Sequence, residues 1–247
     1  MMDERPHAAK RAVVYGPGTR LSWRLGRSLG IDLLGSKEKY CSFDCIYCEL
    51  GEGRLHVVRR REFVTTAEIK KAMEAVQTTD FDYVTFSGSG EPALASNLGE
   101  AIGIAREVFN KPVAVLTNAS LMPRDDVRGE MTKADFVIAK IDAPDDELYR
   151  RINRPWVRTP LRDIIGALEI FRNHFRGKFA LQMMFIEANK PAAAAMARIA
   201  LEIEADEVQL CTPLRDCPEP TLSPAEMARI KKAFTGVKGV RMVYDER

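Results

Sequence analysis

Short apolar runs alternate with longer amphipathic stretches along most of this chain. In the longer stretches apolar residues recur at helical spacing, whereas the short runs have the length of buried strands. This alternation predicts βα units around a parallel sheet, and therefore an α/β fold. The runs that we expect to form strands are residues 28–34, 83–87, 113–117, 136–141, 179–185 and 208–210.

Two sequences mark where helices begin. Thr65 and Ser223 are each followed three residues later by glutamate, the pattern of a capping box in which side chains satisfy unpaired backbone donors. Pro224 stands at the first helical position, which proline favours. After the second of these helices, the apolar run 240–244 is expected to add an edge strand.

The length and composition fit one domain. The chain has 247 residues, of which 46% are hydrophobic and 29% charged, enough to bury a large core. We find no internal repeat or low-complexity linker. We therefore expect a single domain with an N-terminal extension over 1–27, a core over 28–213, and a C-terminal helix with its edge strand over 214–247.

The overall charge gives no argument for a nucleic-acid partner. Lys and Arg number 37 against 35 Asp and Glu, for a net charge of +2. No run approaches the ~18 apolar residues of a membrane-spanning helix, and residues 1–6 lack the apolar core of a signal peptide. We expect a cytosolic protein with no membrane partner, in a reducing compartment that keeps thiols free.

Three cysteines lie close together as CxxxCxxC, at Cys41, Cys45 and Cys48. Three thiolates can hold three irons of a [4Fe-4S] cube and leave the fourth iron open to another ligand. A structural zinc site is the alternative, with His56 as its nearest fourth ligand. Three buried structural thiols are a further alternative, although polar residues between the cysteines disfavour it.

A glycine-rich segment, SGSGEP at residues 87–92, follows the apolar run 83–86. It is expected to be a loop at the end of a strand. Glycines let the backbone approach a ligand closely, and the carboxylate of Glu91 could accept hydrogen bonds from an ammonium group. A phosphate-binding loop is not indicated, because the chain contains no GxxxxGK[ST] sequence.

The segment CSFDCIYC at residues 41–48 resembles the cluster loop of radical S-adenosylmethionine (SAM) enzymes. The glycine-rich segment resembles the GGE motif of the same family, with Ser89 in place of the first glycine. The resemblance implies a partial (β/α)6 TIM-like barrel, a [4Fe-4S] cluster and SAM as cofactors, and reductive cleavage of SAM to a 5′-deoxyadenosyl radical that abstracts hydrogen from a substrate.

The resemblance also implies roles for individual residues. Cys41, Cys45 and Cys48 would be the cluster ligands, and Tyr47 would shield the adenine side. Gly90 and Glu91, with Ser89 beside them, would hold the amino group of SAM.

Polar residues at the carboxyl ends of the other strands are candidates too, because chemistry gathers there in barrels of this kind. Asn118 would bind substrate or SAM, unless it only stabilises a turn. Lys140 would neutralise the SAM carboxylate; alternatively, Lys140 and Asp142 pair with each other, since they are two residues apart on one strand face.

The last two strands contribute further candidates for binding SAM. Gln182 or Met184 would touch the ribose or adenine, although methionine at this spacing is more often part of a core. By resemblance, Cys211 and Thr212 belong to the segment whose backbone reads adenine. Cys211 and Cys217 could alternatively be a redox pair, a hydrogen donor to substrate, or bystanders.

Segments 22–31 and 152–155 resemble the subfamily of radical SAM enzymes that includes the tRNA wyosine-forming enzymes. The archaeal members carry further cysteines upstream of the cluster loop, and here no cysteine precedes Cys41. A tRNA-modifying function is therefore an alternative, and the substrate is left open between a small molecule, a peptide and RNA.

Basic residues cluster at 59–61 and again at Arg150, Arg151, Arg154 and Arg158. Both clusters could position a phosphate-bearing substrate, or dock an acidic electron donor such as flavodoxin or ferredoxin. A different class of function, an iron–sulfur electron-transfer or sensor module that binds a nucleotide without turning it over, fits the same motifs.

Overall fold

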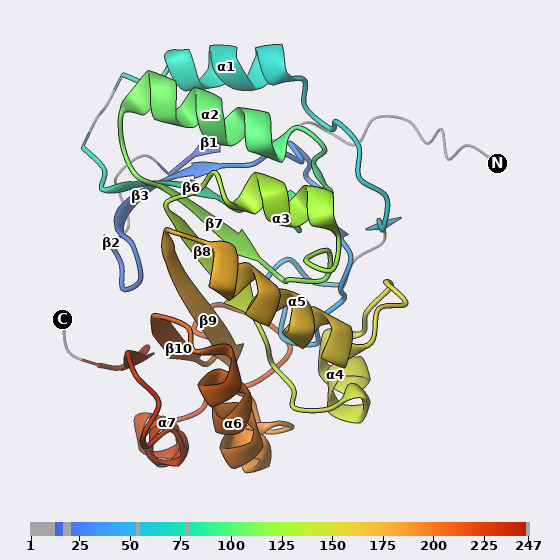
Figure 1. Cartoon of the computed structure of the whole chain (residues 1–247), viewed down its shortest axis with the longest axis vertical. Coiled ribbons are helices and arrows are strands. Elements are labelled where there is room, and N and C mark those ends of the chain that lie inside the picture. The colour runs from blue at the N-terminus through green and yellow to red at the C-terminus, as the bar shows by residue number, and fades with distance from the viewer. Residues whose placement is uncertain (1–12, 17–20, 53–54, 78–79, 246–247) are drawn as a thin grey trace.

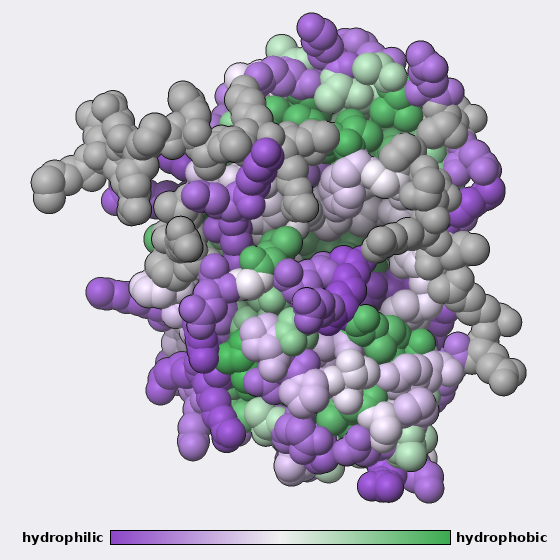
Figure 2. Space-filling model, turned by 180° about the vertical axis from the view of Figure 1, so that it is seen from behind, coloured by the Kyte–Doolittle hydropathy of each residue, from purple (hydrophilic) through white to green (hydrophobic). Residues whose placement is uncertain are grey.

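The computed structural model describes residues 13–16, 21–52, 55–77 and 80–245. Figure 1 shows helices α2, α3, α5 and α6 along one side of a twisted sheet, with α4 beyond its edge. Figure 2 shows the other side of the molecule, where the hydrophobic patches outside the grey atoms are small and separate. No helix in these ranges is long and apolar enough to cross a membrane.

The main sheet has nine strands, in the order β1-β3-β6-β7-β8-β9-β10-β11 with β2 paired to β3. All neighbours from β3 to β11 are parallel, whereas β1 and β2 pair with β3 in antiparallel fashion. The strands of this sheet are β1 (Val14–Tyr15), β2 (Leu21–Ser22), β3 (Gly26–Ile31), β6 (Tyr83–Phe86), β7 (Val113–Thr117), β8 (Phe136–Lys140), β9 (Lys178–Met184), β10 (Glu207–Cys211) and β11 (Val240–Met242).

Helices connect successive strands of the parallel part. They are α1 (Thr66–Glu74), α2 (Leu98–Phe109), α3 (Asp125–Met131), α4 (Asp146–Asn153), α5 (Leu161–His174), α6 (Ala193–Ile203) and α7 (Pro224–Ala233), with short 3₁₀ turns η1 (Pro92–Leu94) and η2 (Lys190–Ala192). Capping boxes at Thr65 and Ser223 start α1 and α7, as the sequence predicts.

The predicted α/β fold with a parallel sheet is confirmed, and so is the edge strand near the C-terminus, which pairs in parallel with β10. The first predicted strand is wrong at its end, because β3 stops at Ile31 and not at residue 34. The carboxylate of Asp32 accepts hydrogen bonds from the backbone N–H groups of Leu34 and Gly35, which turns the chain out of the sheet.

Four strands of two residues each were not predicted: β1, β2, and the separate pair β4 (Tyr40–Cys41) and β5 (Leu55–His56). Two residues are too few to show an alternating pattern, so their pairing depends on contacts that the local sequence does not reveal. The first two lie within the expected N-terminal extension and join its end to the sheet.

The two faces of the sheet differ in what covers them. The main core lies between the sheet and the helices and includes Leu29, Val84, Val115 and Val137. The opposite face, which we call the inner face, carries a smaller apolar cluster of Leu25, Ala114, Phe136, Ile138 and Ala180. Side chains alternate between faces along a strand, so register places the later residues Lys140, Gln182 and Cys211 on this inner face too.

The cysteine loop sits directly on the glycine-rich loop after β6. Tyr40 and Gly90 form a parallel bridge, in which the backbone N–H of Tyr40 donates to Ser89 O at 2.9 Å and that of Glu91 donates to Tyr40 O at 3.0 Å. A Cβ atom on Gly90 would overlap the carbonyl oxygen of Tyr40. Only glycine therefore permits this approach of two backbones.

Substituting Gly90 by alanine should lower the free energy of unfolding by about 2 kcal/mol or more, because a backbone carbonyl cannot move aside as a flexible side chain can. Gly103 in α2 is the matched control, since nothing lies within 4 Å of its added Cβ. Gly103→Ala should raise the free energy of unfolding by about 0.5–1 kcal/mol. Urea titration measures both, and equal effects of the two variants would contradict the close approach.

Candidate functional site

The cysteine loop is held along one side by the last turn of α4 and the segment that follows it. The backbone N–H of Ile46 donates to Ile152 O at 2.9 Å, that of Asp44 to Asn153 O at 3.0 Å, and that of Trp156 to Ser42 O at 2.9 Å. Lys39, almost fully buried, donates from Nζ to Asp44 Oδ1 at 2.8 Å and to Gly51 O at 3.1 Å. Contacts between protein groups thus fix the loop without a cofactor.

Amide groups point at two of the three sulfurs. Asn118 Nδ2 lies 3.4 Å from Cys41 Sγ, Asn153 Nδ2 lies 3.4 Å from Cys45 Sγ, and the Phe43 backbone nitrogen lies 3.5 Å from Cys41 Sγ. All three cysteines are free. Burial raises the pKa of Cys41 to about 12 and also raises that of Cys45.

These observations test whether the residues fit an iron–sulfur cluster. Buried thiols with raised pKa values need a strongly cationic centre to hold them as thiolates, and N–H donors beside the sulfurs are the usual surroundings of cluster ligands. The donor set fits a cluster held by three thiolates. The side chain of His56, the alternative fourth ligand for zinc, lies outside the part of the chain that the structure describes.

Glu91 is a buried carboxylate at the centre of the glycine-rich loop. Its Oε1 accepts from Ala93 N at 3.0 Å and from Thr117 Oγ1 at 2.7 Å, and its Oε2 accepts from Asn118 N at 2.6 Å. Burial raises its pKa despite these donors. A carboxylate has about four lone-pair sites, so one acceptor position is left after the three protein donors.

Ser89 and Gly88 join this loop to the end of β3. The Ser89 hydroxyl and backbone N–H both donate to Asp32 Oδ2, at 2.7 and 3.1 Å. Gly88 has φ of +134°, and a Cβ there would overlap the carboxylate of Asp32. The serine that stands where the family motif has glycine therefore has a structural partner, and Gly88 supplies the conformational freedom.

Tyr47, Asp142 and Asn153 form a buried network under the cysteine loop. Asp142 Oδ2 accepts from the Tyr47 hydroxyl and from Asn153 Nδ2, the latter at 2.8 Å, while Oδ1 accepts from Met184 N at 2.9 Å. The Tyr47 ring packs against Ile152 and Ile186. Tyr47 thus ties the cysteine loop to the carboxyl end of β8.

Lys140 lies over the Tyr47 ring, with Nζ 4.7 Å from the ring centroid and 3.3 Å from the hydroxyl. No direct ion pair joins Lys140 to Asp142 in the described part of the chain, and Tyr47 stands between the two groups. Despite burial, the negative charge of Asp142 raises the pKa of Lys140. The expected neutralising pair is therefore mediated by a phenol, and the ammonium stays charged.

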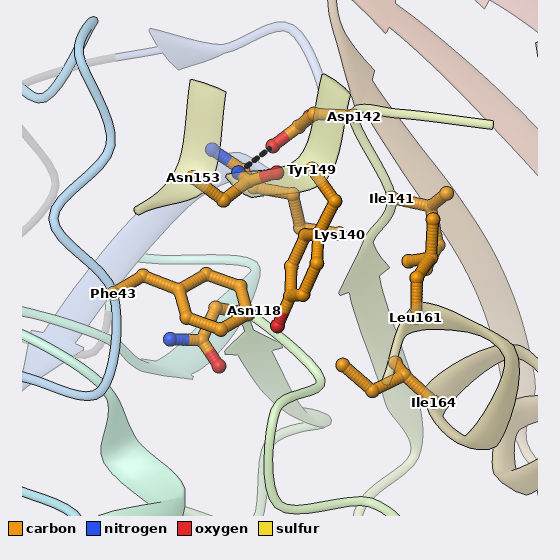
Figure 3. Close-up of a pocket in the computed structure, with 9 residues that line it drawn as sticks. All are labelled: Phe43, Asn118, Lys140, Ile141, Asp142, Tyr149, Asn153, Leu161 and Ile164. Atoms are coloured by element: carbon orange, nitrogen blue, oxygen red, sulfur yellow. Dashed lines mark hydrogen bonds between the residues drawn. The ribbon is translucent and has the colours of Figure 1, made fainter. Parts of the chain in front are cut away.

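Figure 3 shows a small pocket beside this network, lined by Asn118, Lys140 and Tyr149 among others. The Tyr149 hydroxyl points into it, near the ring of Phe43, and has no hydrogen-bond partner among the residues that the structure describes. The pocket connects the cysteine loop, through Phe43, with the apolar face of α5 at Leu161 and Ile164.

The remaining predicted site residues lie on β9 and β10. Gln182 and Cys211 are buried on the inner face, and both contact Arg24. The Thr212 hydroxyl accepts from Leu222 N at 2.9 Å and so closes the loop after β10. Cys217 packs in the same small cluster as Tyr47 and Cys45, which places it close to the cysteine loop.

The arginine cluster at 59–61 keeps Arg59 and Arg61 exposed on the surface, so the substrate or partner expected there stays a prediction. Arg60 is nearly buried and bonds to Ala93 O, Ala95 O, Asp126 and Glu130. Arg61 stacks on the rings of Tyr40 and Phe63. Arg60 and Arg61 therefore pack against residues beside the cysteine loop. Neighbouring charged residues can face the protein in this way when partner groups surround them.

The second arginine cluster also lies on the surface. Arg150, Arg151, Arg154 and Arg158 are all exposed around the segment that holds the cysteine loop. Arg154 lies 3.7 Å from Glu52 and 4.0 Å from Asp44.

The described residues thus form a sheet of parallel strands with a loop of three free thiols at its carboxyl edge, an arrangement that points to one class of protein. A family model described as the Radical SAM superfamily matches residues 39–198, a range that includes the three cysteines, Glu91 and Lys140. The chain belongs to this superfamily, whose members typically use a [4Fe-4S] cluster and SAM.

Two relatives identify the family more closely. A UPF0026 protein of Synechocystis sp. is 37% identical over 206 residues, covering 83% of this chain and 77% of the relative. A UPF0026 protein of Methanocaldococcus jannaschii is 33% identical over 227 residues, covering 89% of this chain and 69% of the relative. The chain belongs to the UPF0026 family.

A solved structure shows the same fold. The structure described as TYW1 with a lysine-pyruvate adduct bound has a TM-score of 0.66 and 17% identity, covering 87% of this chain and 76% of that one. At this identity the likeness shows the fold alone. It confirms the expected α/β architecture of the radical SAM partial barrel.

Sequence reasoning missed two residues that touch the site. Asn153 was visible only as part of the sequence INRP, and its contact with Cys45 depends on how α4 ends against the cysteine loop. Lys39 precedes the first cysteine by two residues. Its opposite charge to the nearby Asp44 was the one sign in the sequence that the two could pair.

Two tyrosines in this site give a matched test of the network. Tyr47→Phe should lower the free energy of unfolding by about 1–2 kcal/mol, because buried Asp142 loses a donor. Tyr149→Phe should be neutral or stabilising, since it removes a buried hydroxyl that has no partner in the described ranges. Urea unfolding of the protein without cofactor measures both, and a larger loss from Tyr149→Phe would contradict the described hydrogen bonds.

Proposed function

We propose that this protein is an enzyme that cleaves SAM reductively at a [4Fe-4S] cluster and uses the product radical on a substrate. The observation that carries the proposal is the pairing of two loops. The loop with the three free thiols packs against the glycine-rich loop, and the buried carboxylate of Glu91 in that second loop keeps one position for a hydrogen-bond donor. The cluster and SAM, when bound, supply one-electron cleavage of the sulfonium to a 5′-deoxyadenosyl radical.

The chain's own residues hold and orient these cofactors. Cys41, Cys45 and Cys48 would hold three irons as thiolates. Asn118 and Asn153 direct N–H groups at two of these sulfurs, which stabilises negative charge on them. Glu91 would accept a hydrogen bond from the amino group of SAM, and Gly90 gives the loop its close backbone approach.

Lys140 is the cation best placed for the SAM carboxylate. Its ammonium is held over Tyr47 without a direct carboxylate partner among the described residues, so it can pair with an incoming anion. Tyr47 and Asp142 act by positioning this ammonium. Thr212, Cys211 and Gln182 stand at the ends of the strands where adenosine would lie.

The substrate class is not defined by the family. A tRNA-modifying function would need a basic surface near the site, and exposed arginines lie in both clusters, at Arg59 and Arg61 and in the four arginines at the end of α4 and after it. The same exposed arginines, next to the cysteine loop, suit an acidic electron donor such as flavodoxin or ferredoxin. Salt dependence of tRNA binding separates the two uses of this surface.

The proposed function is tested by anaerobic reconstitution with iron and sulfide, followed by dithionite and SAM. The protein should release 5′-deoxyadenosine. Cys45→Ala should lose both the cluster absorbance and SAM cleavage, because two thiolates do not hold the cube. Cys217→Ala is the matched control, a free cysteine outside the motif, and should keep the cluster.

Each outcome of this experiment is informative. A protein that takes up the cluster but never cleaves SAM would support an electron-transfer or sensor module in place of an enzyme. A protein that binds a single zinc ion and no iron would contradict both.

Asn153 should also tune the reduction potential of the cluster. Removing its amide in Asn153→Ala should make the midpoint potential more negative by tens of millivolts, because an N–H donor to sulfur favours the more negative reduced state. Asn173→Ala, an exposed asparagine at the end of α5, is the control and should leave the potential unchanged. Potentiometric titration of the reconstituted proteins measures the shift; an unchanged potential in Asn153→Ala would contradict the described contact.

A further inference from the structure

The hairpin between β2 and β3 crosses the inner face of the sheet. Leu25, at its tip, belongs to the small apolar cluster with Phe136 and Ala180, so it covers the part of this face that these two residues form. Trp23 reaches the far edge, where Arg241 donates to its carbonyl oxygen at 2.8 Å. Figure 1 shows this hairpin extending from β3 toward β9 and β10. Its polar residue, Arg24, is thereby brought next to the strand ends of the site.

The guanidinium of Arg24 is held at one edge only. With the Gln182 amide oxygen facing it, that oxygen accepts from Arg24 Nε at 2.8 Å and from Nη2 at 2.7 Å. Nη2 also lies 3.7 Å from Cys211 Sγ, and the Trp23 ring lies 4.9 Å from the guanidinium carbon. No protein acceptor in the described part of the chain is in contact with Nη1. The edge formed by Nη1 and Nη2 therefore retains free donors.

Among the described residues Arg24 also has no carboxylate partner, which sets it apart from Arg241 on β11. Arg241 lies 3.6 Å from Glu207, whereas no described carboxylate comes within ion-pair distance of Arg24. Arg24 is only partly exposed, so water compensates its charge incompletely. An arginine in this setting favours an anionic ligand.

A second observation points to a ligand at the same place. Gln209 lies beside Gln182 in the sheet register, two residues before Cys211, and is fully buried. Its amide nitrogen donates to Glu207 at 2.8 Å, but its amide oxygen has no partner among the described residues. A buried amide oxygen without a partner is satisfied by an N–H or O–H donor and not by a carboxylate, so it would take a donor group of the same ligand or a water molecule.

We infer that Arg24 binds a carboxylate of the substrate, with Gln182 as the residue that positions its guanidinium. This rests on the proposed function, since it names the chemical class of the molecule that the enzyme would act on. Lys140 lies on the same inner face, on β8 beside Gln182, and Arg24 contacts Gln182 and Cys211. The two cations would then divide the anions: Lys140 takes the SAM carboxylate and Arg24 takes that of the substrate.

The geometry favours a carboxylate over a phosphate. One planar guanidinium edge with two N–H groups matches the two oxygens of a carboxylate. A phosphate group can engage the same edge but carries more charge. Arg241, which also packs on the Trp23 ring, is paired with Glu207, so the described residues around Trp23 leave one unpaired cation, which balances the single charge of a carboxylate. The inferred substrate is therefore an organic acid or a molecule with an acidic side chain.

The inference is tested on the reconstituted protein with SAM bound, using acetate as the probe and acetamide as its neutral isostere. In protein with isotope-labelled arginine, the Nε–H resonance that is missing in Arg24→Lys belongs to Arg24. Acetate should shift this resonance saturably, and acetamide should not. The affinity for acetate, measured from broadening of its methyl signal, should fall about tenfold or more in Arg24→Gln, because a bidentate charge-assisted pair is lost.

Arg198→Gln, which removes an exposed arginine on α6, is the matched control and should bind acetate as the unmodified protein does. An Arg24 resonance that acetate does not move, or that acetamide moves equally, would overturn the inference. Binding of inorganic phosphate in place of acetate would overturn the choice of a carboxylate. Release of 5′-deoxyadenosine, assayed separately, reports on the proposed function, so failure of one claim is distinguishable from failure of the other.

Discussion

The contact on which the site depends is the backbone pairing between Tyr40 and Gly90. It brings the cysteine loop, which leaves the sheet after β3, onto the carboxyl end of the neighbouring strand β6. Backbone hydrogen bonds at this distance require that no side chain intervenes, and glycine meets that requirement. The thiols and the carboxylate of Glu91 consequently lie at one edge of the sheet.

Buried polar groups then fix each element of the site against the next. Glu91 accepts from the backbone of Asn118, Asn118 donates to Cys41, Asn153 donates to Cys45, and Asp142 joins Asn153 to Tyr47. Such a network is favourable only when its members are satisfied, because each unpaired buried group is costly. The protein's own hydrogen bonds therefore position the site without a cofactor.

The features that could be predicted from the sequence are those written in contiguous residues. The cysteine spacing, the glycine-rich loop, the capping boxes and the six parallel strands each depend on local patterns, and the structure contains all of them. Arg60 shows the limit: three adjacent arginines read as a surface cluster, but acidic residues of α3 surround one of them. Partners that lie dozens of residues away leave no mark in the local pattern.

Arg24 and Asn153 illustrate the same limit at the site itself. Arg24 reaches the site because its hairpin packs on the sheet through Leu25. Asn153 reaches it because the end of α4 packs through Ile152. Resemblance marked both segments as belonging to the family, without indicating which side chain faces inward. The inner face thus combines the apolar cluster around Leu25 with the cations Arg24 and Lys140 near the carboxyl ends of the strands. This arrangement follows from tertiary structure.

The central claim is that three thiolates hold a four-iron cube and leave one iron for SAM. Mössbauer spectroscopy of protein reconstituted with iron-57 tests it most directly. We expect SAM to shift the signal of one iron in every four and to leave the other three unchanged. A spectrum that SAM does not alter, or one without the signature of a four-iron cluster, would contradict it.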